Sequence, residues 1–81
     1  MPRVIPPDSR ILARRQRIAE RIRAARLHAN LTQRALAERT GMDRSSYQMV
    51  EYGTVSPPLD SLLRISDAIG VPLSDLVRED E

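Results

Sequence analysis

Cysteine, phenylalanine, tryptophan and lysine are all absent from this chain of 81 residues, and histidine occurs once, as His28. Without cysteine the chain forms neither a disulfide framework nor a thiolate metal site, and a single histidine excludes a histidine cluster. The sequence also has no glycine-rich phosphate loop and no cluster of residues with metal-ligand spacing. We therefore expect a protein that is not an enzyme and binds no cofactor or metal.

Long hydrophobic runs are missing as well. No apolar stretch approaches the roughly 20 residues that span a bilayer, and the start, MPRVIPPDSR, lacks the hydrophobic segment of a signal peptide. We therefore expect a cytoplasmic protein that makes no membrane contact. Two tyrosines are the only aromatic residues, so stacking platforms for single-stranded nucleic acid are essentially absent.

What the chain does have is an uneven distribution of charge around a net charge of +2. Residues 1–44 carry 11 Arg against four acidic residues, giving +7, whereas residues 45–81 carry two Arg against seven acidic residues, giving −5. The basic half favours a polyanionic partner, and the shortage of aromatic residues favours a duplex. The exclusive use of Arg suits bidentate phosphate and guanine contacts, or it reflects a GC-rich genome.

Capping residues predict five helices and no strand, in a single domain over residues 8–78. Asp8 or Ser9, then Thr32, then Asp43 are suitable N-caps for the first three helices. Residues 1–7 contain three prolines and are expected to form a flexible N-terminal arm, and residues 79–81 an acidic tail. The first three helices are expected at about 9–29, 33–40 and 44–52. The fourth is expected to end before Gly70, and the fifth to begin at Pro72.

Apolar residues at helical spacing predict the core. The first helix has one apolar stripe, formed by Ile11, Ile18, Ile22, Ala25 and Ala29. The fourth has another, formed by Leu59, Leu62, Ile65 and Ile69, and in the fifth the apolar residues are Leu73, Leu76 and Val77. Ile11 and Leu12 lie on extra turns at the start of the first helix, where they could contact a second subunit or another protein, or pack on the fifth helix.

The most informative segment is 33–53, which predicts two short helices joined by a tight turn at Gly41. On a helical wheel, Ser46, Tyr47 and Val50 lie on the packing side of the second of these helices. The opposite side is polar and suits the major groove of DNA, where Arg and Gln form paired hydrogen bonds with base edges; a solvated helix face is the alternative. The residues on this polar side are Arg44, Ser45, Gln48, Met49 and Tyr52.

Residues 17–77, about three quarters of the chain, resemble the Cro/C1 (XRE)-type helix-turn-helix family of transcriptional regulators. Four features carry the resemblance: IRAAR at 22–26, LTQRALAERTGM at 31–42, Glu51 with Gly53, and LLRISDAIGVPLSDL at 62–76. The resemblance implies an all-α fold, a compact five-helix lambda-repressor-like DNA-binding domain. In this chain the first helix would be extended by about two turns.

The resemblance also implies roles for individual residues. In the family, the Gln that opens the second helix contacts the DNA backbone or an adjacent base, which implies this role for Gln33, with Thr32 beside it. Early positions of the third helix contact bases, which implies guanine for Arg44 and adenine for Gln48. The remaining positions carried over are Ser45, Met49 and Tyr52, of which the last two could be incidental surface.

Two further expectations concern the inside of the domain. The family pairs an Arg late in the first helix with a Glu late in the third, which implies an internal ion pair between Arg26 and Glu51. Tyr47 replaces the usual small aliphatic residue, and we expect it to fill the core with its hydroxyl at the protein surface or the DNA backbone.

The resemblance therefore implies a sequence-specific regulator that binds double-stranded DNA, most simply a repressor associated with the nucleoid. One recognition helix covers about half a site, so a homodimer is expected, at least on DNA. The alternative is an antitoxin or adaptor whose main role is to bind a partner protein, since the acidic half of the chain suits a basic partner.

Overall fold

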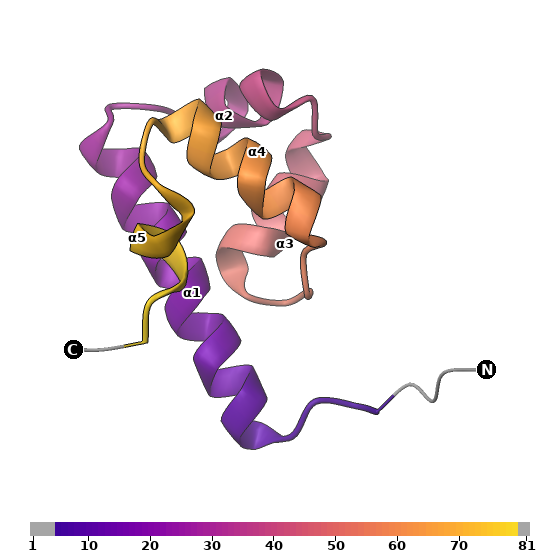
Figure 1. Ribbon diagram of the computed structural model, residues 1–81. Coiled ribbons are helices and arrows are strands. Elements are labelled where there is room, and N and C mark those ends of the chain that lie inside the picture. The colour runs from indigo at the N-terminus through magenta and orange to yellow at the C-terminus, as the bar shows by residue number, and fades with distance from the viewer. Residues whose placement is uncertain (1–4, 80–81) are drawn as a thin grey trace.

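The computed structural model describes residues 5–79, and these residues form five α-helices and no strand (Figure 1). The predicted all-α fold is therefore confirmed. Of the predicted arm and tail, residues 1–4, 80 and 81 lie outside the described residues. The helices are α1 (Ser9–His28), α2 (Gln33–Thr40), α3 (Arg44–Tyr52), α4 (Leu59–Ile69) and α5 (Leu73–Val77).

Side-chain caps begin two of the helices as predicted. The Asp8 carboxylate accepts a hydrogen bond from the Ile11 amide at 2.9 Å, and the Thr32 hydroxyl accepts one from the Ala35 amide at 3.0 Å. The prediction for Asp43 was wrong in part, because this residue holds the N-cap position of α3 without a side-chain hydrogen bond. Asp43 is exposed, so water can satisfy the free amides of the first turn.

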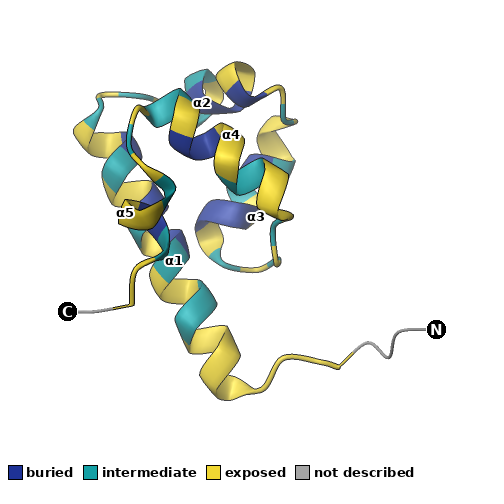
Figure 2. Cartoon of the chain, viewed as in Figure 1, coloured by how far each residue is buried: buried dark blue, intermediate teal, exposed yellow. Residues whose placement is uncertain are grey.

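All five helices contribute to one core, and their buried positions face each other (Figure 2). Helices α2 to α5 have 5 to 11 residues and are too short to be stable alone, so burial of this apolar surface holds them together. Within residues 5–79 no helix combines the length and hydrophobicity needed to cross a lipid bilayer. The core residues are Ile22 from α1, Leu36 and Ala37 from α2, Tyr47 and Val50 from α3, Ile65 from α4, and Leu76 from α5.

Two residues of the predicted apolar stripes are not buried, Leu59 against expectation and Ile11 on the extra turns of α1. Leu59 is 61% exposed, because it is the first residue of α4 and lies at the edge of the apolar stripe centred on Ile65. Ile11 is 43% exposed, because the first turns of α1 extend beyond the other helices (Figure 1). The core therefore begins further along α1, near Ile18 and Ile22.

The turn between α2 and α3 depends on Gly41. Its φ is +74°, in the left-handed region, and its amide donates to the Glu38 carbonyl at 3.2 Å. A Cβ atom at this position would meet no atom within 4 Å. The requirement for glycine is therefore conformational and not steric.

We predict that Gly41→Ala lowers the free energy of unfolding by about 1–2 kcal/mol, the cost of left-handed backbone for a residue with a Cβ. Gly41→Asn should cost less, because Asn tolerates this conformation and Asn30 adopts it here with a φ of 60°. Denaturant unfolding of the three proteins measures both values. Equal losses for Ala and Asn would contradict the conformational explanation.

Candidate nucleic-acid interface

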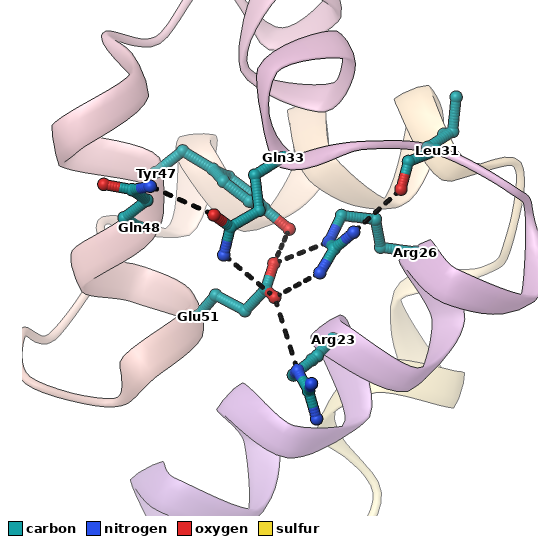
Figure 3. Close-up of polar contacts among 7 residues, drawn as sticks. All are labelled: Arg23, Arg26, Leu31, Gln33, Tyr47, Gln48 and Glu51. Atoms are coloured by element: carbon teal, nitrogen blue, oxygen red, sulfur yellow. Dashed lines mark hydrogen bonds and ion pairs between the residues drawn. The ribbon is translucent and has the colours of Figure 1, made fainter.

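A buried ion pair between Arg26 of α1 and Glu51 of α3 lies behind the outer face of α3 (Figure 3). The contact is bidentate: Arg26 Nη2 lies 2.7 Å from Glu51 Oε1, and Arg26 Nε lies 2.9 Å from Oε2. Both side chains are almost inaccessible, at 8% and 0% exposure. The remaining donor, Arg26 Nη1, bonds to the Leu31 carbonyl at 2.8 Å and so fixes the loop before α2.

Two more hydrogen-bond donors contact the Glu51 carboxylate, and Arg23 Nε of α1 lies 4.0 Å from Oε1 as a second, exposed cation (Figure 3). The Tyr47 hydroxyl donates to Oε2 at 2.5 Å, and Gln33 Nε2 donates to Oε1 at 3.3 Å (Figure 3). Tyr47 fills the core as expected, but its hydroxyl does not reach the surface or the DNA side. The physical reason is that Glu51 lies one turn further along α3, where the carboxylate offers the phenol a charged acceptor.

The pKa values of Glu51, Arg26 and Tyr47 are all shifted in the directions that keep the ion pair charged and the phenol protonated. Burial alone would raise the pKa of Glu51, but hydrogen bonds from Arg26, Tyr47 and Gln33 outweigh it, and the pKa lies below its usual value. The hydrogen bond to Glu51 raises the pKa of Arg26. Burial raises the pKa of Tyr47, and the adjacent carboxylate raises it further, so the phenol stays protonated.

The buried carboxylate also fixes two amide side chains at the surface. A carboxylate accepts only, so Gln33 must turn its NH2 group toward Glu51 and its oxygen away from it. That oxygen accepts a hydrogen bond from Gln48 Nε2 at 3.0 Å (Figure 3). The orientation of both amides therefore follows from the charge of Glu51, and the polar chain connects the interior with the outer face of α3.

The outer face of α3 has the composition predicted from the helical wheel, with one difference. Arg44, Ser45, Met49 and Tyr52 are exposed, whereas Gln48 is half-buried because it bonds to Gln33. Met49 and Tyr52 are 43% and 54% exposed. The structure thus places the Gln48 side chain against α2. Met49 and Tyr52 lie on α3, and their side chains make no polar contact among the described residues.

An open cleft of about 560 Å³ lies where the beginnings of α2 and α3 meet. Its lining includes Thr32, Gln33 and Arg44 from the predicted set, and it adds Arg34. Within residues 5–79 no carboxylate pairs with Arg34 or Arg44. Together with the positive end of the α2 dipole, these two guanidinium groups make the cleft suitable for an anion.

Sequence reasoning missed several features of this site, including the contacts that Gln33 makes with Glu51 and Gln48. The spacing of Tyr47 and Glu51, four residues apart on one helix, was a signal for their hydrogen bond. Arg34 was overlooked, although it follows Gln33 in the first turn of α2. Nothing in the sequence indicated that Arg15 Nε would donate to the Gly53 carbonyl at 3.2 Å, a bond that ties α1 to the end of α3.

Two short helices joined at a left-handed glycine, with the second presenting a polar face, define a helix-turn-helix protein. A family model described as Helix-turn-helix matches residues 22–76, which is more than half of the chain. The chain therefore belongs to the helix-turn-helix family of the Cro/C1 (XRE) type, as the resemblance implied.

Two curated relatives are repressors by name. The transcriptional repressor RstR of the cryptic phage CTXphi from Vibrio cholerae is 32% identical over 63 residues, which is 78% of this chain and 57% of the relative. The immunity repressor protein of Bacillus phage phi105 is 33% identical over 63 residues, covering 78% of this chain and 44% of the relative. The chain thus spans about half the length of the curated relatives it matches.

Solved structures show the same fold. The restriction-modification controller protein C.AhdI from Aeromonas hydrophila superimposes with a TM-score of 0.77 and 30% identity, covering 79% of this chain and 97% of that chain. The hypothetical transcription factor NHTF from Neisseria superimposes with a TM-score of 0.76 and 26% identity, covering 94% and 85%.

We predict that Glu51→Ala lowers the free energy of unfolding by about 3–5 kcal/mol, because the charge of Arg26 would remain buried without its partner. The matched control is Glu38→Ala on the exposed side of α2, which should change stability by less than about 0.5 kcal/mol. Chemical denaturation measures both, and equal losses would show that the pair does not support the fold.

Stability should also fall in acid. Because folding lowers the pKa of Glu51, its contribution is complete above the unfolded pKa of about 4.3 and is lost as pH drops through the lower folded pKa. The melting temperature of the parent should therefore fall more steeply as the pH drops below about 4.3 than that of Glu51→Gln, which has no carboxylate to protonate. Parallel pH profiles would contradict this role for Glu51.

Proposed function

We propose that this chain is a sequence-specific regulator of transcription that binds double-stranded DNA with α3 in the major groove, most simply as a repressor. The observation that supports this most strongly is the polar chain from Glu51 through Gln33 to Gln48, which presents an oriented amide on the outer side of α3. The repressor names of the two relatives support the same role.

Gln48 is the residue whose preference follows most directly from its surroundings. Since one N–H of its amide bonds to Gln33, its oxygen and its second N–H remain available. An acceptor and a donor side by side match the N6 amino group and N7 of adenine in the major groove. We therefore assign adenine to Gln48.

The other exposed residues of α3 suit the remaining contacts of a recognition helix. Arg44 lies in the first turn and is exposed, which suits a bidentate contact with guanine O6 and N7. Ser45 can bond to a base edge or a phosphate, and the exposed Met49 offers apolar contact to a thymine methyl group. Tyr52, at the end of the helix, suits a phosphate.

The cleft at the start of α2 suits the DNA backbone. A phosphate there would meet the first amides of α2 together with Thr32 and Gln33, and the charges of Arg34 and Arg44. Backbone contacts at this point would fix how α3 enters the groove, since α2 and α3 pack against each other. Two chains are needed for a full site, so we propose a homodimer on DNA.

We predict that Arg44→Ala and Gln48→Ala each weaken binding to the preferred site by about 1–3 kcal/mol and weaken binding to random duplex far less. Arg64→Ala, which removes an exposed Arg from α4, serves as the control for lost charge. Fluorescence anisotropy at one fixed salt concentration measures these affinities. Equal losses on both duplexes would exclude direct base contacts by these residues.

The preferred site comes from selection of bound fragments from sheared genomic DNA, with the Arg44→Ala, Gln48→Ala double variant run alongside. Enrichment of a two-fold motif by the parent alone would support the regulator. No enrichment at low salt would overturn it and favour the partner-binding role of an antitoxin or adaptor.

A further inference from the structure

The first two turns of α1 carry a surface that the other residues within 5–79 leave partly exposed. Asp8, Ile11, Leu12 and Arg15 follow the spacing i, i+3, i+4, i+7, so they lie on one side of the helix. Ile11 and Leu12 are 43% and 40% exposed. The same side of α1 continues into the core at Ile22, so these turns prolong a packing surface beyond the point where the other helices end (Figure 2). We call these four residues the α1 seam.

An apolar groove runs along this part of the helix. It encloses about 570 Å³ and is lined by Ile11, Ile18 and Arg15 of α1, by residues 5–7 before the helix, and by Pro57 before α4. Exposed apolar surface on isolated helical turns is unfavourable in water, and such turns are usually stabilised by tertiary packing. The groove and the seam therefore indicate a surface that a second molecule covers.

The charged residues at the two ends of the α1 seam indicate that the second molecule is another copy of this chain. If two α1 helices lie antiparallel about a two-fold axis between Ile11 and Leu12, each Ile11 meets the other chain's Leu12, and each Asp8 meets the other chain's Arg15. The pattern is thus complementary to itself, with an apolar centre and an ion pair at each end. Asp8 caps α1 and Arg15 Nε donates to the Gly53 carbonyl, but both are neutral contacts, and neither side chain has an ion-pair partner within residues 5–79.

We propose that the α1 seam is the dimer interface of this protein, formed by antiparallel pairing with the same turns of a second copy. This inference rests on the proposed function, which needs a dimer, but it locates the interface outside the segment matched by the family model, residues 22–76. Arg14, which borders the groove, does not oppose the pairing, because Glu79 forms an ion pair with it. The surface is only two turns long, so the dimer is weak in solution and DNA strengthens it.

Cross-linking tests the interface without DNA, and the absence of native cysteine makes any introduced thiol unique. Leu12→Cys lies in the seam, and Leu27→Cys is the matched control, an exposed Leu near the other end of the same helix at 50% exposure. With a short bifunctional maleimide, Leu12→Cys should form covalent dimers at least about tenfold faster than Leu27→Cys, because pairing raises the effective concentration of the two thiols. Equal rates, or none, would overturn the proposal.

Charge reversal tests the antiparallel register. In the Leu12→Cys background, Asp8→Arg alone places Arg against Arg15 of its partner, and Arg15→Asp alone places Asp against Asp8, so each should lose the rapid cross-linking. Mixing the two variants restores both ion pairs and should restore the cross-linked heterodimer. Restoration also shows that the single variants fold. Failure of the mixture to cross-link faster than either variant alone would exclude this register.

Measurements of DNA binding distinguish a failure of the proposed interface from a failure of the proposed function. Ile11→Asp should keep the affinity of the parent for a single half-site and lose cooperative binding to the two-fold site, whereas Leu27→Asp should change neither. Unchanged cooperativity in Ile11→Asp would overturn the interface and leave the regulator intact. If the parent binds no duplex, the proposed function fails, and the cross-linking result still decides whether the seam pairs.

Discussion

The bidentate ion pair between Arg26 and Glu51 is the interaction on which the rest of the structure depends. A buried carboxylate costs several kcal/mol unless its charge and its lone pairs are satisfied, and here donors from three helices converge on it. Arg26 belongs to α1, Gln33 to α2, and Tyr47 to the same helix as Glu51. The pair therefore sets the relative positions of the two helices of the motif and of the helix behind them.

The core and this polar cluster support each other. With only 8 residues in α2 and 9 in α3, neither helix would persist alone in water, so both require the apolar contacts around Leu36, Tyr47 and Ile65. Tyr47 takes part in both sets of contacts, because its ring fills the core while its hydroxyl binds the carboxylate. The proposed recognition surface is held from behind in this way, and preorganisation of a binding surface reduces the entropic cost of binding.

The two halves of α1 have different structural roles. The second half of this helix belongs to the family fold and contributes Ile22 and Arg26 to the interior. The first half lies outside the matched segment and carries the groove and the seam proposed to hold a second copy. The proposed contacts to bases and to a partner chain thus lie on different parts of the domain.

The sequence by itself determined the five helices, the caps at Asp8 and Thr32, the left-handed turn at Gly41 and the family, because these depend on neighbouring residues and on periodicity. It also suggested the contact between Arg26 and Glu51. It placed Leu59 in the core and the Tyr47 hydroxyl at the surface, and both were wrong. Only the tertiary structure decided these positions and the directions of the Gln33 and Gln48 amides, because each depends on side chains from helices that meet only after folding.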